Sequence, residues 1–252
     1  MERKAEINNS RLSIIIATFN SGQFLQACLD SIHNQRIKDI EIVLVDGKST
    51  DDTISIIKAN AAPNLKWISE SDKGTYDAFN KGVTLATGKW IYFLGSDDRL
   101  RPEFSDLVDR LKDTNTVYYG NSIGFCIGDN KPAYDLYEGE FDKYRLAKCC
   151  MNHQAIIYPA TVFKKYAYDL KYKIAADYDL NIKVWGDDFF KKEFYNLTIV
   201  NYHLNGLSSL STDRIFKQDK PERIKQSMGW FIYARYMYKK YKHKRKGLSD
   251  FD

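Results

Sequence analysis

The stretch Trp90-Ile91-Tyr92-Phe93-Leu94-Gly95-Ser96-Asp97-Asp98 is the best guide to the architecture of the chain. Its first five residues are apolar or aromatic, a pattern that predicts a buried strand. Two neighbouring carboxylates follow where the strand ends, and like charges at this spacing repel each other. A divalent cation would relieve the repulsion, because Mg²⁺ and Mn²⁺ take oxygen ligands and bridge to the phosphates of a substrate. The alternative is a turn or helix start that carries two solvated acids.

Three similar strands precede this one, and helical segments separate them. Residues 12–19, 40–45 and 65–69 are rich in β-branched and aliphatic side chains. Residues 23–35 and 75–86 instead repeat their apolar side chains at helical spacing. Strands that alternate with helices predict βαβ units and a mostly parallel sheet, so we expect an α/β fold.

Ligands of such sheets bind at the carboxyl ends of the strands. All four predicted strands place polar or acidic residues there, namely Thr18-Phe19-Asn20, Asp46-Gly47, Ser69-Glu70-Ser71-Asp72 and Ser96-Asp97-Asp98. One polar loop means little, but four in succession predict a ligand site at this edge. On the helix at 75–86, Asp77, Asn80 and Lys81 form a polar stripe. This stripe is either a solvated, salt-bridged face or a second wall of the same cleft.

The composition bears on several other classes of protein. A chain of 252 residues that is 44% hydrophobic can bury a real core. Much of the net charge of +5 comes from the run Lys239–Lys246, so the remainder is near neutral and predicts no nucleic-acid partner. The four cysteines form no CxxC pair, which favours reduced thiols in the cytoplasm. No segment predicts a signal peptide or a membrane span.

Four motifs in this order resemble those of family 2 glycosyltransferases with the GT-A fold. The motifs occupy residues 13–20, 42–51, 69–82 and 86–98, and the resemblance covers residues 11–210. It is similar in particular to the bacterial branch that builds capsule, exopolysaccharide and O-antigen. The resemblance implies a Rossmann-like, mostly parallel sheet flanked by helices, and an enzyme that uses a nucleotide-diphosphate sugar.

The resemblance also implies roles for single residues. Ser96-Asp97-Asp98 matches the metal motif of the family, so Asp98 is the expected ligand of Mn²⁺ or Mg²⁺. Asp97 is then the neighbour that contacts the donor ribose or the metal. Further residues match positions that bind the nucleotide and the donor sugar: Thr18, Phe19, Asn20, Asp46, Asp72, Lys73, Asp77, Asn80, Lys81 and Ser96.

The catalytic base is expected at Asp177, which matches the second acid of the family's Glu-Asp motif. Asp179 is the rival base, but it lies two residues further along a predicted helix and would point away. His153 matches a loop that approaches the diphosphate or the acceptor. The alternatives are that both acids only stabilise the start of their helix, and that His153 is a buried histidine bonded to the backbone.

A base and a metal suit a direct displacement at an anomeric carbon, because the acceptor hydroxyl must lose a proton and the leaving diphosphate must be neutralised. One displacement inverts the anomeric centre. The expected substrates are a UDP-linked sugar and a glycan on a polyprenyl diphosphate. A nucleotidyltransferase is one alternative, although Thr18–Gly22 lacks a Gly-rich, basic loop. A non-catalytic nucleotide-binding or scaffold protein is another.

We expect a glycosyltransferase domain at residues 8–210, divided into a nucleotide-sugar half at 8–100 and an acceptor half at 101–210, and a C-terminal extension at 211–252. Residues 222–246 of this extension read as a helix that mixes aromatic and basic side chains, which suits an anionic membrane surface. The protein would then be peripheral on the cytoplasmic face of the plasma membrane. The alternative is a helix packed on the domain with a solvated basic tail.

Overall fold

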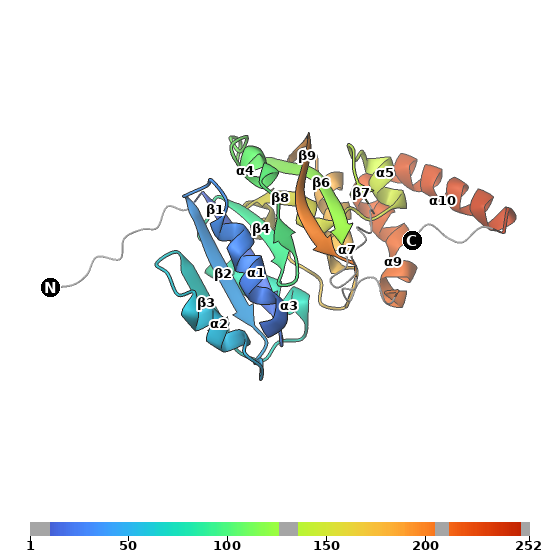
Figure 1. The fold of residues 1–252 in the computed structure, drawn as a ribbon. Helices are drawn as coiled ribbons and strands as arrows, with labels where there is room; N and C mark the ends of the chain where they lie inside the picture. The colour runs from blue at the N-terminus through green and yellow to red at the C-terminus, as the bar shows by residue number, and fades with distance from the viewer. Residues whose placement is uncertain (1–10, 126–135, 205–211, 248–252) are drawn as a thin grey trace.

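The computed structural model describes residues 11–125, 136–204 and 212–247, which form a nine-stranded sheet flanked by helices (Figure 1). The strand order is β3-β2-β1-β4-β8-β6-β9-β5, and β7 pairs with β6. The first four strands are parallel neighbours: β1 (Leu12–Thr18), β2 (Ile40–Asp46), β3 (Leu65–Ser69) and β4 (Trp90–Gly95). The predicted parallel α/β arrangement is therefore confirmed in this half.

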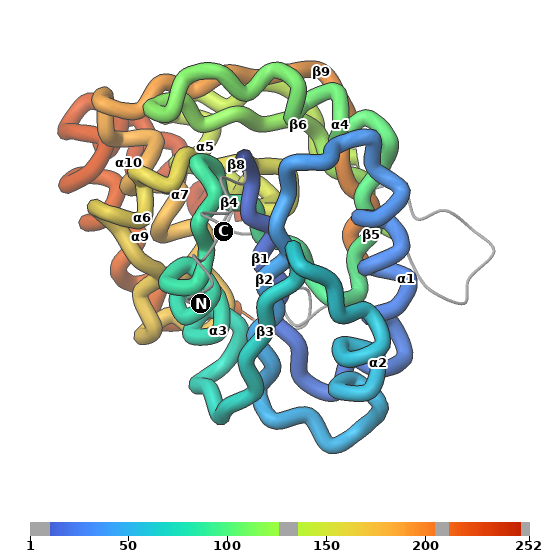
Figure 2. Tube along the Cα trace, turned by 90° about the vertical axis from the view of Figure 1, so that its left-hand side faces the viewer, coloured from blue at the N-terminus to red at the C-terminus, as the bar shows by residue number. Residues whose placement is uncertain are grey.

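Helices cover both faces of these strands (Figure 2). They are α1 (Gly22–His33) and α2 (Thr53–Ala59) on one face and α3 (Thr75–Leu85) on the other. Successive residues of a strand point to opposite faces, so Ile14 and Ile16 join the core under α1 and α2, while Ile15 joins the core under α3. All seven residues of β2 are buried, as expected for a parallel strand that is covered on both sides.

The second half of the chain adds mixed strands to the sheet. β8 (Ile156–Pro159) runs antiparallel to β4, and β6 (Thr116–Phe125) lies between β8 and β9 (Lys191–His203). From the sequence, strands are expected here only at residues 117–119 and 199–202. The other residues of β6 and β9 are largely polar side chains and glycines without a clear apolar alternation, and register shifts beside Asn121 interrupt their ladder.

Shorter elements connect these strands. They are β5 (Arg99–Leu100), β7 (Leu136–Tyr137), α4 (Glu103–Val108), α5 (Lys143–Lys148), α6 (Val162–Lys165) and η1, a 3₁₀ turn at His153–Ala155. The longer helix α7 (Ala176–Gly186) begins just before Asp177, close to the predicted start.

Two helices form the C-terminal extension, where the sequence predicts one. α9 (Arg214–Met228) and α10 (Trp230–Arg245) are separated by Gly229, whose φ of 87° is a left-handed conformation that favours glycine. Ile224 of α9 is fully buried in the core that also contains α7. α9 is therefore part of the packed protein. The predicted limits at residues 8 and 210–211 lie outside the described residues.

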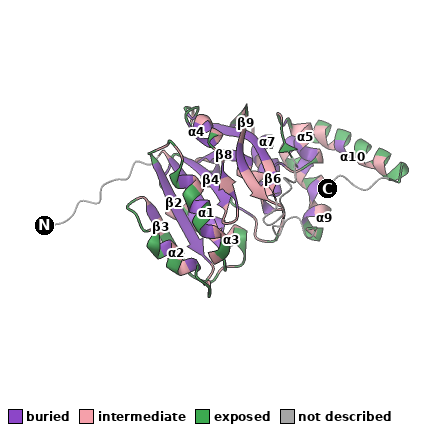
Figure 3. Cartoon of the chain, viewed as in Figure 1, coloured by how far each residue is buried: buried purple, intermediate pink, exposed green. Residues whose placement is uncertain are grey.

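Burial distinguishes the sheet from the last helix (Figure 3). The central strands are almost entirely buried, whereas most of α10 is exposed. Among the helices in the described ranges, none combines the length and the apolar character that crossing a membrane requires.

Candidate active site

The carboxyl ends of β1, β2 and β3 meet around the buried side chain of Asp46. This carboxylate accepts hydrogen bonds from the hydroxyl of Thr18 at 3.2 Å, from that of Ser69 at 2.7 Å, and from both the hydroxyl and the backbone N–H of Ser49. A Cβ at the next position, Gly47, would lie 2.7 Å from a carboxylate oxygen of Asp72, so a larger residue there would displace that side chain. Asp46 therefore holds the ends of β1 and β3 and the loop after β2 together.

The loop after β1 carries an exposed aromatic ring, that of Phe19. Asn20 adopts a left-handed conformation with a φ of 49°, and its side-chain oxygen accepts a hydrogen bond from the backbone N–H of Thr50 at 2.9 Å. The hydroxyls of Ser21 and Ser96 lie 2.9 Å apart. The loops after β1 and β4 therefore form one continuous edge.

Asp97 and Asp98 follow β4 and lie beside the end of β9. Asp98 is buried and accepts hydrogen bonds from the backbone N–H of His203 at 2.8 Å and from the side chain of Gln154 at 2.7 Å. Asp97 Oδ2 lies 3.1 Å from His203 Nδ1. Burial, and then repulsion from Asp97, raises the pKa of Asp98 to about 6, although the bonds from His203 and Gln154 act in the opposite direction.

This pair of acids has the donor chemistry of a divalent-cation site. Two adjacent carboxylates, one of them buried, carry an excess of negative charge that a hard cation would compensate. Nδ1 of His203 lies beside Asp97, and Nε2 of the same ring is buried without a hydrogen-bond partner among the described residues. In the same ranges, no three His, Cys, Asp or Glu side chains are grouped as a metal site. Asp97 and Asp98, with His203 beside them, are the residues that fit Mn²⁺ or Mg²⁺.

The polar stripe of α3 divides into two parts. Asp77 accepts a hydrogen bond from the backbone N–H of Lys73 at 2.9 Å, and Lys81 donates one to a carbonyl of the same loop at 2.8 Å. These two residues hold the loop after β3. Asn80 instead exchanges two hydrogen bonds with the backbone of Tyr168, at 2.9 and 3.0 Å. Asn80 therefore joins α3 to the second half of the chain.

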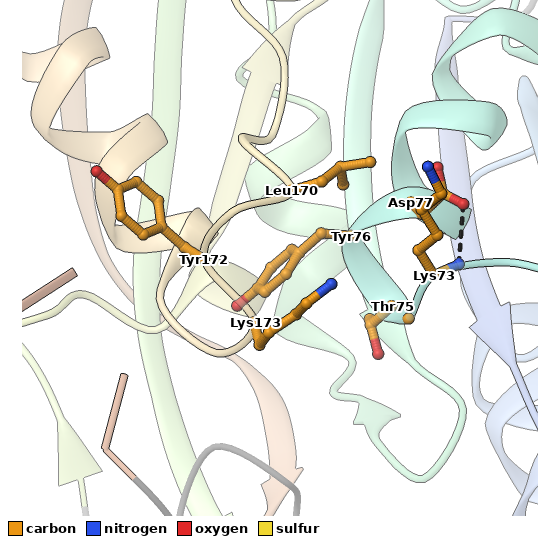
Figure 4. A pocket seen from close by; sticks show the side chains of 8 residues that line it. Lys73, Thr75, Tyr76, Asp77, Leu170, Tyr172 and Lys173 are labelled. Atoms are coloured by element: carbon orange, nitrogen blue, oxygen red, sulfur yellow. Dashed lines mark hydrogen bonds between the residues drawn. The ribbon is translucent and has the colours of Figure 1, made fainter. Parts of the chain in front are cut away.

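A small pocket lies between the amino end of α3 and the segment that leads to α7 (Figure 4). Lys73 and Lys173 contribute to its lining from these two segments, and the ring of Tyr76 lies between them. The hydroxyl of Tyr76 continues past the pocket to the carboxylate of Asp177. Tyr76 therefore lines the same pocket as Lys73 and also contacts Asp177, the predicted base.

Three donors surround the carboxylate of Asp177. The Tyr76 hydroxyl lies 2.9 Å from Oδ1, the backbone N–H of Tyr178 donates to Oδ1 at 2.8 Å, and His153 Nδ1 lies 3.0 Å from Oδ2. Burial, and then the negative charge of Asp177, raises the pKa of Tyr76 well above its usual value, so Tyr76 remains a neutral donor. His153 bonds to a side chain, which contradicts the alternative of a histidine bonded only to the backbone.

Asp179 has different surroundings. It is fully buried and forms ion pairs with Lys183 at 2.6 Å and with Arg223 of α9 at 2.5 Å. Asp179 therefore ties α7 to α9 and has no surface to offer to an acceptor. This geometry removes it as a rival to Asp177.

One short turn joins the two groups of acids. Within η1, His153 reaches Asp177 while its neighbour Gln154 reaches Asp98. The sequence does not single out Gln154, Tyr76 or His203 as site residues. The first two lie within or next to recognised motifs, which is a usable signal. His203 has none, because the pairing of β9 with β6 brings it to the acids.

Known proteins share both the sequence pattern and the fold. The family description "Glycosyl transferase family 2" matches residues 13–169, more than half of the chain. A PGL/p-HBAD biosynthesis glycosyltransferase of Mycobacterium tuberculosis is 36% identical over 227 residues, which cover 83% of each protein. The fold, the site and these matches define a glycosyltransferase enzyme. The chain belongs to glycosyl transferase family 2.

Solved structures resemble the chain at lower sequence identity. S. aureus TarS 1-349 in complex with UDP-GlcNAc has a TM-score of 0.72 and 20% identity, over 90% of this chain and 71% of that one. The mannosyltransferase PcManGT from Pyrobaculum calidifontis, in complex with GDP-Man and Mn²⁺, has a TM-score of 0.58 and 16% identity, over 87% of this chain and 62% of that one. These similarities confirm the predicted GT-A fold.

Proposed function

We propose that the protein is an inverting, metal-dependent glycosyltransferase that moves a hexose or N-acetylhexosamine from a nucleotide-diphosphate sugar, UDP-linked, to a glycan hydroxyl. One observation carries this proposal. Within one turn, Gln154 contacts Asp98 and its neighbour His153 contacts Asp177. The consecutive residues are thus the partners of Asp98 and Asp177, and a direct displacement requires the functions proposed for these two acids close together.

The edge formed by β1 to β4 supports a nucleotide-sugar donor. The exposed ring of Phe19 can stack on a base, since every base offers a flat face. Lys73 and Asp77, which are hydrogen-bonded to each other, would contact the donor sugar and the ribose in this proposal. A cation at Asp97 and Asp98 would supply charge neutralisation to the leaving diphosphate. The UDP-GlcNAc named for TarS favours uracil as the base, and the GDP-Man named for PcManGT makes guanine the competitor to test.

The residues around Asp177, at the start of α7, support the transfer of a proton. In the proposed reaction, the acceptor oxygen bonds to the anomeric carbon while the bond from that carbon to the diphosphate breaks. The acceptor O–H bond also breaks, and its proton passes to the pair formed by Asp177 and His153. Tyr76 positions the carboxylate through its hydroxyl. Because only one displacement occurs, an α-linked donor gives a β-linked product.

We further propose that the acceptor glycan is attached to a polyprenyl diphosphate at the cytoplasmic face of the plasma membrane, in the synthesis of a bacterial surface polysaccharide such as O-antigen or capsule. The aromatic and basic residues of α10 support a location at an anionic membrane surface. The similarity to a mycobacterial PGL/p-HBAD biosynthesis glycosyltransferase supports a role in a biosynthetic pathway.

The full-length protein, Mn²⁺, a panel of UDP- and GDP-sugars and synthetic lipid-diphosphate GlcNAc or GalNAc would test the proposal. Mass spectrometry should detect the acceptor plus one sugar, with release of UDP, and NMR should show an inverted anomeric centre. A retained configuration would contradict the single displacement. Transfer of a nucleotidyl group in place of the sugar would show that the reaction class itself is wrong.

A further inference from the structure

The last helix, α10, has one face that packs on the protein. Tyr236 is fully buried on this face, and Ile232 and Tyr233 pack against the same core. Arg235 stacks on the ring of Tyr144 in α5, 4.0 Å from its centroid. α10 is therefore held against α5 and α9, so its orientation relative to the rest of the protein is defined.

The other face of α10 exposes large apolar side chains. Trp230, Phe231, Tyr238 and Tyr241 are 66%, 72%, 62% and 57% exposed, and Met237 lies among them. At about 100° of rotation per residue, these five side chains fall within an arc of about 120°. The buried side chains of the helix lie outside this arc. Exposed apolar side chains that form a continuous stripe mark an interaction surface, whereas isolated ones need no explanation.

Positive charge accompanies this stripe. The helix contains six Lys and Arg residues and no acid between Trp230 and Arg245. Several of these cations lie beside the exposed rings: Lys242 is 5.2 Å from the ring centroid of Tyr238, and Arg245 is 5.8 Å from that of Tyr241. The surface is thus apolar along its middle and cationic at its margin.

We propose that this face of α10 docks on an anionic phospholipid bilayer, with Trp230, Phe231 and Tyr238 in the interface and the Lys and Arg side chains on the headgroups. Tyrosine and tryptophan rings favour the boundary between headgroups and acyl chains, and each cation near such a surface adds attraction. A second copy of the same face would bring like charges together, which opposes self-association. A nucleic acid would match the charge but would leave the apolar stripe in water.

The docked helix is connected to the proposed active site through buried contacts. α10 follows α9 after the single residue Gly229, and Arg223 of α9 pairs with Asp179 of α7 at 2.5 Å. Asp177 lies two residues before Asp179 on the same helix. The docking surface therefore sets the position of the site relative to the bilayer. The consequence for a lipid-linked acceptor rests on the proposed function, but the docking itself does not.

Substitutions test this surface better than a truncation, because removal of α9 would also remove the buried Ile224. We would compare the full-length protein, the double variant Phe231→Ser/Tyr238→Ser and the matched control Phe189→Ser/Ile215→Ser. The control removes two exposed side chains from other parts of the surface. Circular dichroism and thermal unfolding would verify that all three proteins fold alike.

Sedimentation with vesicles of equimolar phosphatidylglycerol and phosphatidylcholine would measure binding. We expect the wild type and the control to bind, and the α10 variant to lose about tenfold or more in affinity at high and low salt alike. The variant Lys239→Gln/Lys242→Gln should lose about fivefold per residue at low salt and much less at high salt. Vesicles of phosphatidylcholine alone should bind the wild type more weakly.

Equal binding by the wild type and the α10 variant would overturn the proposal. So would concentration-dependent self-association of the wild type that the same variant abolishes, if no vesicle binding accompanies it. These measurements need neither donor nor acceptor. Vesicle binding without sugar transfer would therefore support the docking surface and contradict the proposed function. Sugar transfer without vesicle binding would support the transfer reaction and contradict the docking surface.

Discussion

Two buried acids lie at opposite ends of the same sheet, and their surroundings differ. Glu41, near the amino end of β2, accepts hydrogen bonds from the hydroxyl of Ser13 at 2.5 Å and that of Thr87 at 2.9 Å, and pairs with Lys66 at 2.8 Å. Although burial acts to raise its pKa, these partners lower it below the ordinary value. Asp98, beyond the carboxyl end of β4, is buried next to a second acid, and its pKa is raised.

The comparison shows that burial alone does not identify a functional acid. Glu41 has a full set of donors and a cation, which is what a stabilising buried charge requires. Asp98 has donors, but the neighbouring charge that acts most strongly on it is that of a second carboxylate, Asp97. The amino end of the sheet is thus built for stability, whereas the carboxyl end retains a deficit of positive charge that a ligand can fill.

Asp98→Asn gives the largest expected effect. Turnover should fall by about 10³-fold, because the leaving diphosphate loses its counter-charge. The variant should nevertheless be at least as resistant to thermal unfolding as the wild type, since a repelled buried charge is removed. Steady-state kinetics in Mn²⁺ and calorimetry would measure the two quantities. Full wild-type activity in EDTA would contradict the metal assignment.

Glu41→Ala should show the opposite behaviour. Loss of this carboxylate leaves the hydroxyl of Ser13 and the backbone N–H of Thr87 without their acceptor, and it leaves Lys66 without its ion-pair partner. We expect the free energy of unfolding to drop by about 3 kcal/mol. Turnover by the protein that remains folded should not change. Urea titration and assays well below the transition would measure both, and a strong loss of turnover in folded protein would break the comparison.

Asp177→Asn should reduce transfer by about 10²-fold while donor binding survives, because the shape is kept and the basicity is lost. The variants His153→Ala and Asp177→Ala would then show which of the two residues accepts the proton. Rescue of His153→Ala by imidazole would show that the histidine takes the proton, and rescue of Asp177→Ala by formate would favour the carboxylate. Tyr76→Phe, which removes the hydroxyl that contacts both Asp177 and the carbonyl of Ile174, should cost about tenfold or less. Unchanged transfer by Asp177→Asn would refute its role as part of the base.

The smallest effect concerns pH and stability. The pKa of Glu41 is lower in the folded protein, so its contribution is present above the ordinary glutamate value of about 4.3. This contribution is lost as the pH falls through the folded value. We would measure thermal unfolding of the wild type between pH 7 and pH 3, a range of about four units that includes the ordinary glutamate pKa. The stability of the wild type should decrease toward the acidic end of this range. Glu41→Gln should show less of this decrease, and parallel curves would indicate that other acids dominate.

The sequence predicts the first half of the fold and site well, because β1, β2 and β4 contain apolar runs and each of the four strands is followed by polar residues. Asp97 and Asp98 are visible in this way. The second half is harder, since the tyrosines and polar residues of β6 and β9 give no clear strand period. His203 therefore escapes prediction, although β9 brings it to 3.1 Å from Asp97. The break between α9 and α10 at Gly229 is also not predicted. The residues around Gly229 suit one continuous helix, and only the left-handed backbone conformation of this glycine separates the two helices.

The burial of β2 also has a consequence for strand register. Its middle residues, Ile42-Val43-Leu44-Val45, are apolar and buried on both faces, so a shift by one residue would exchange one aliphatic side chain for another at little cost. The two acids, Glu41 and Asp46, would be carried to the wrong face and lose the donors that other strands and loops supply. The register of this central strand is thus specified by two charged side chains near its ends. Apolar contacts alone would not distinguish the correct register from a shifted one, but burial of an unpaired charge disfavours the shifted one.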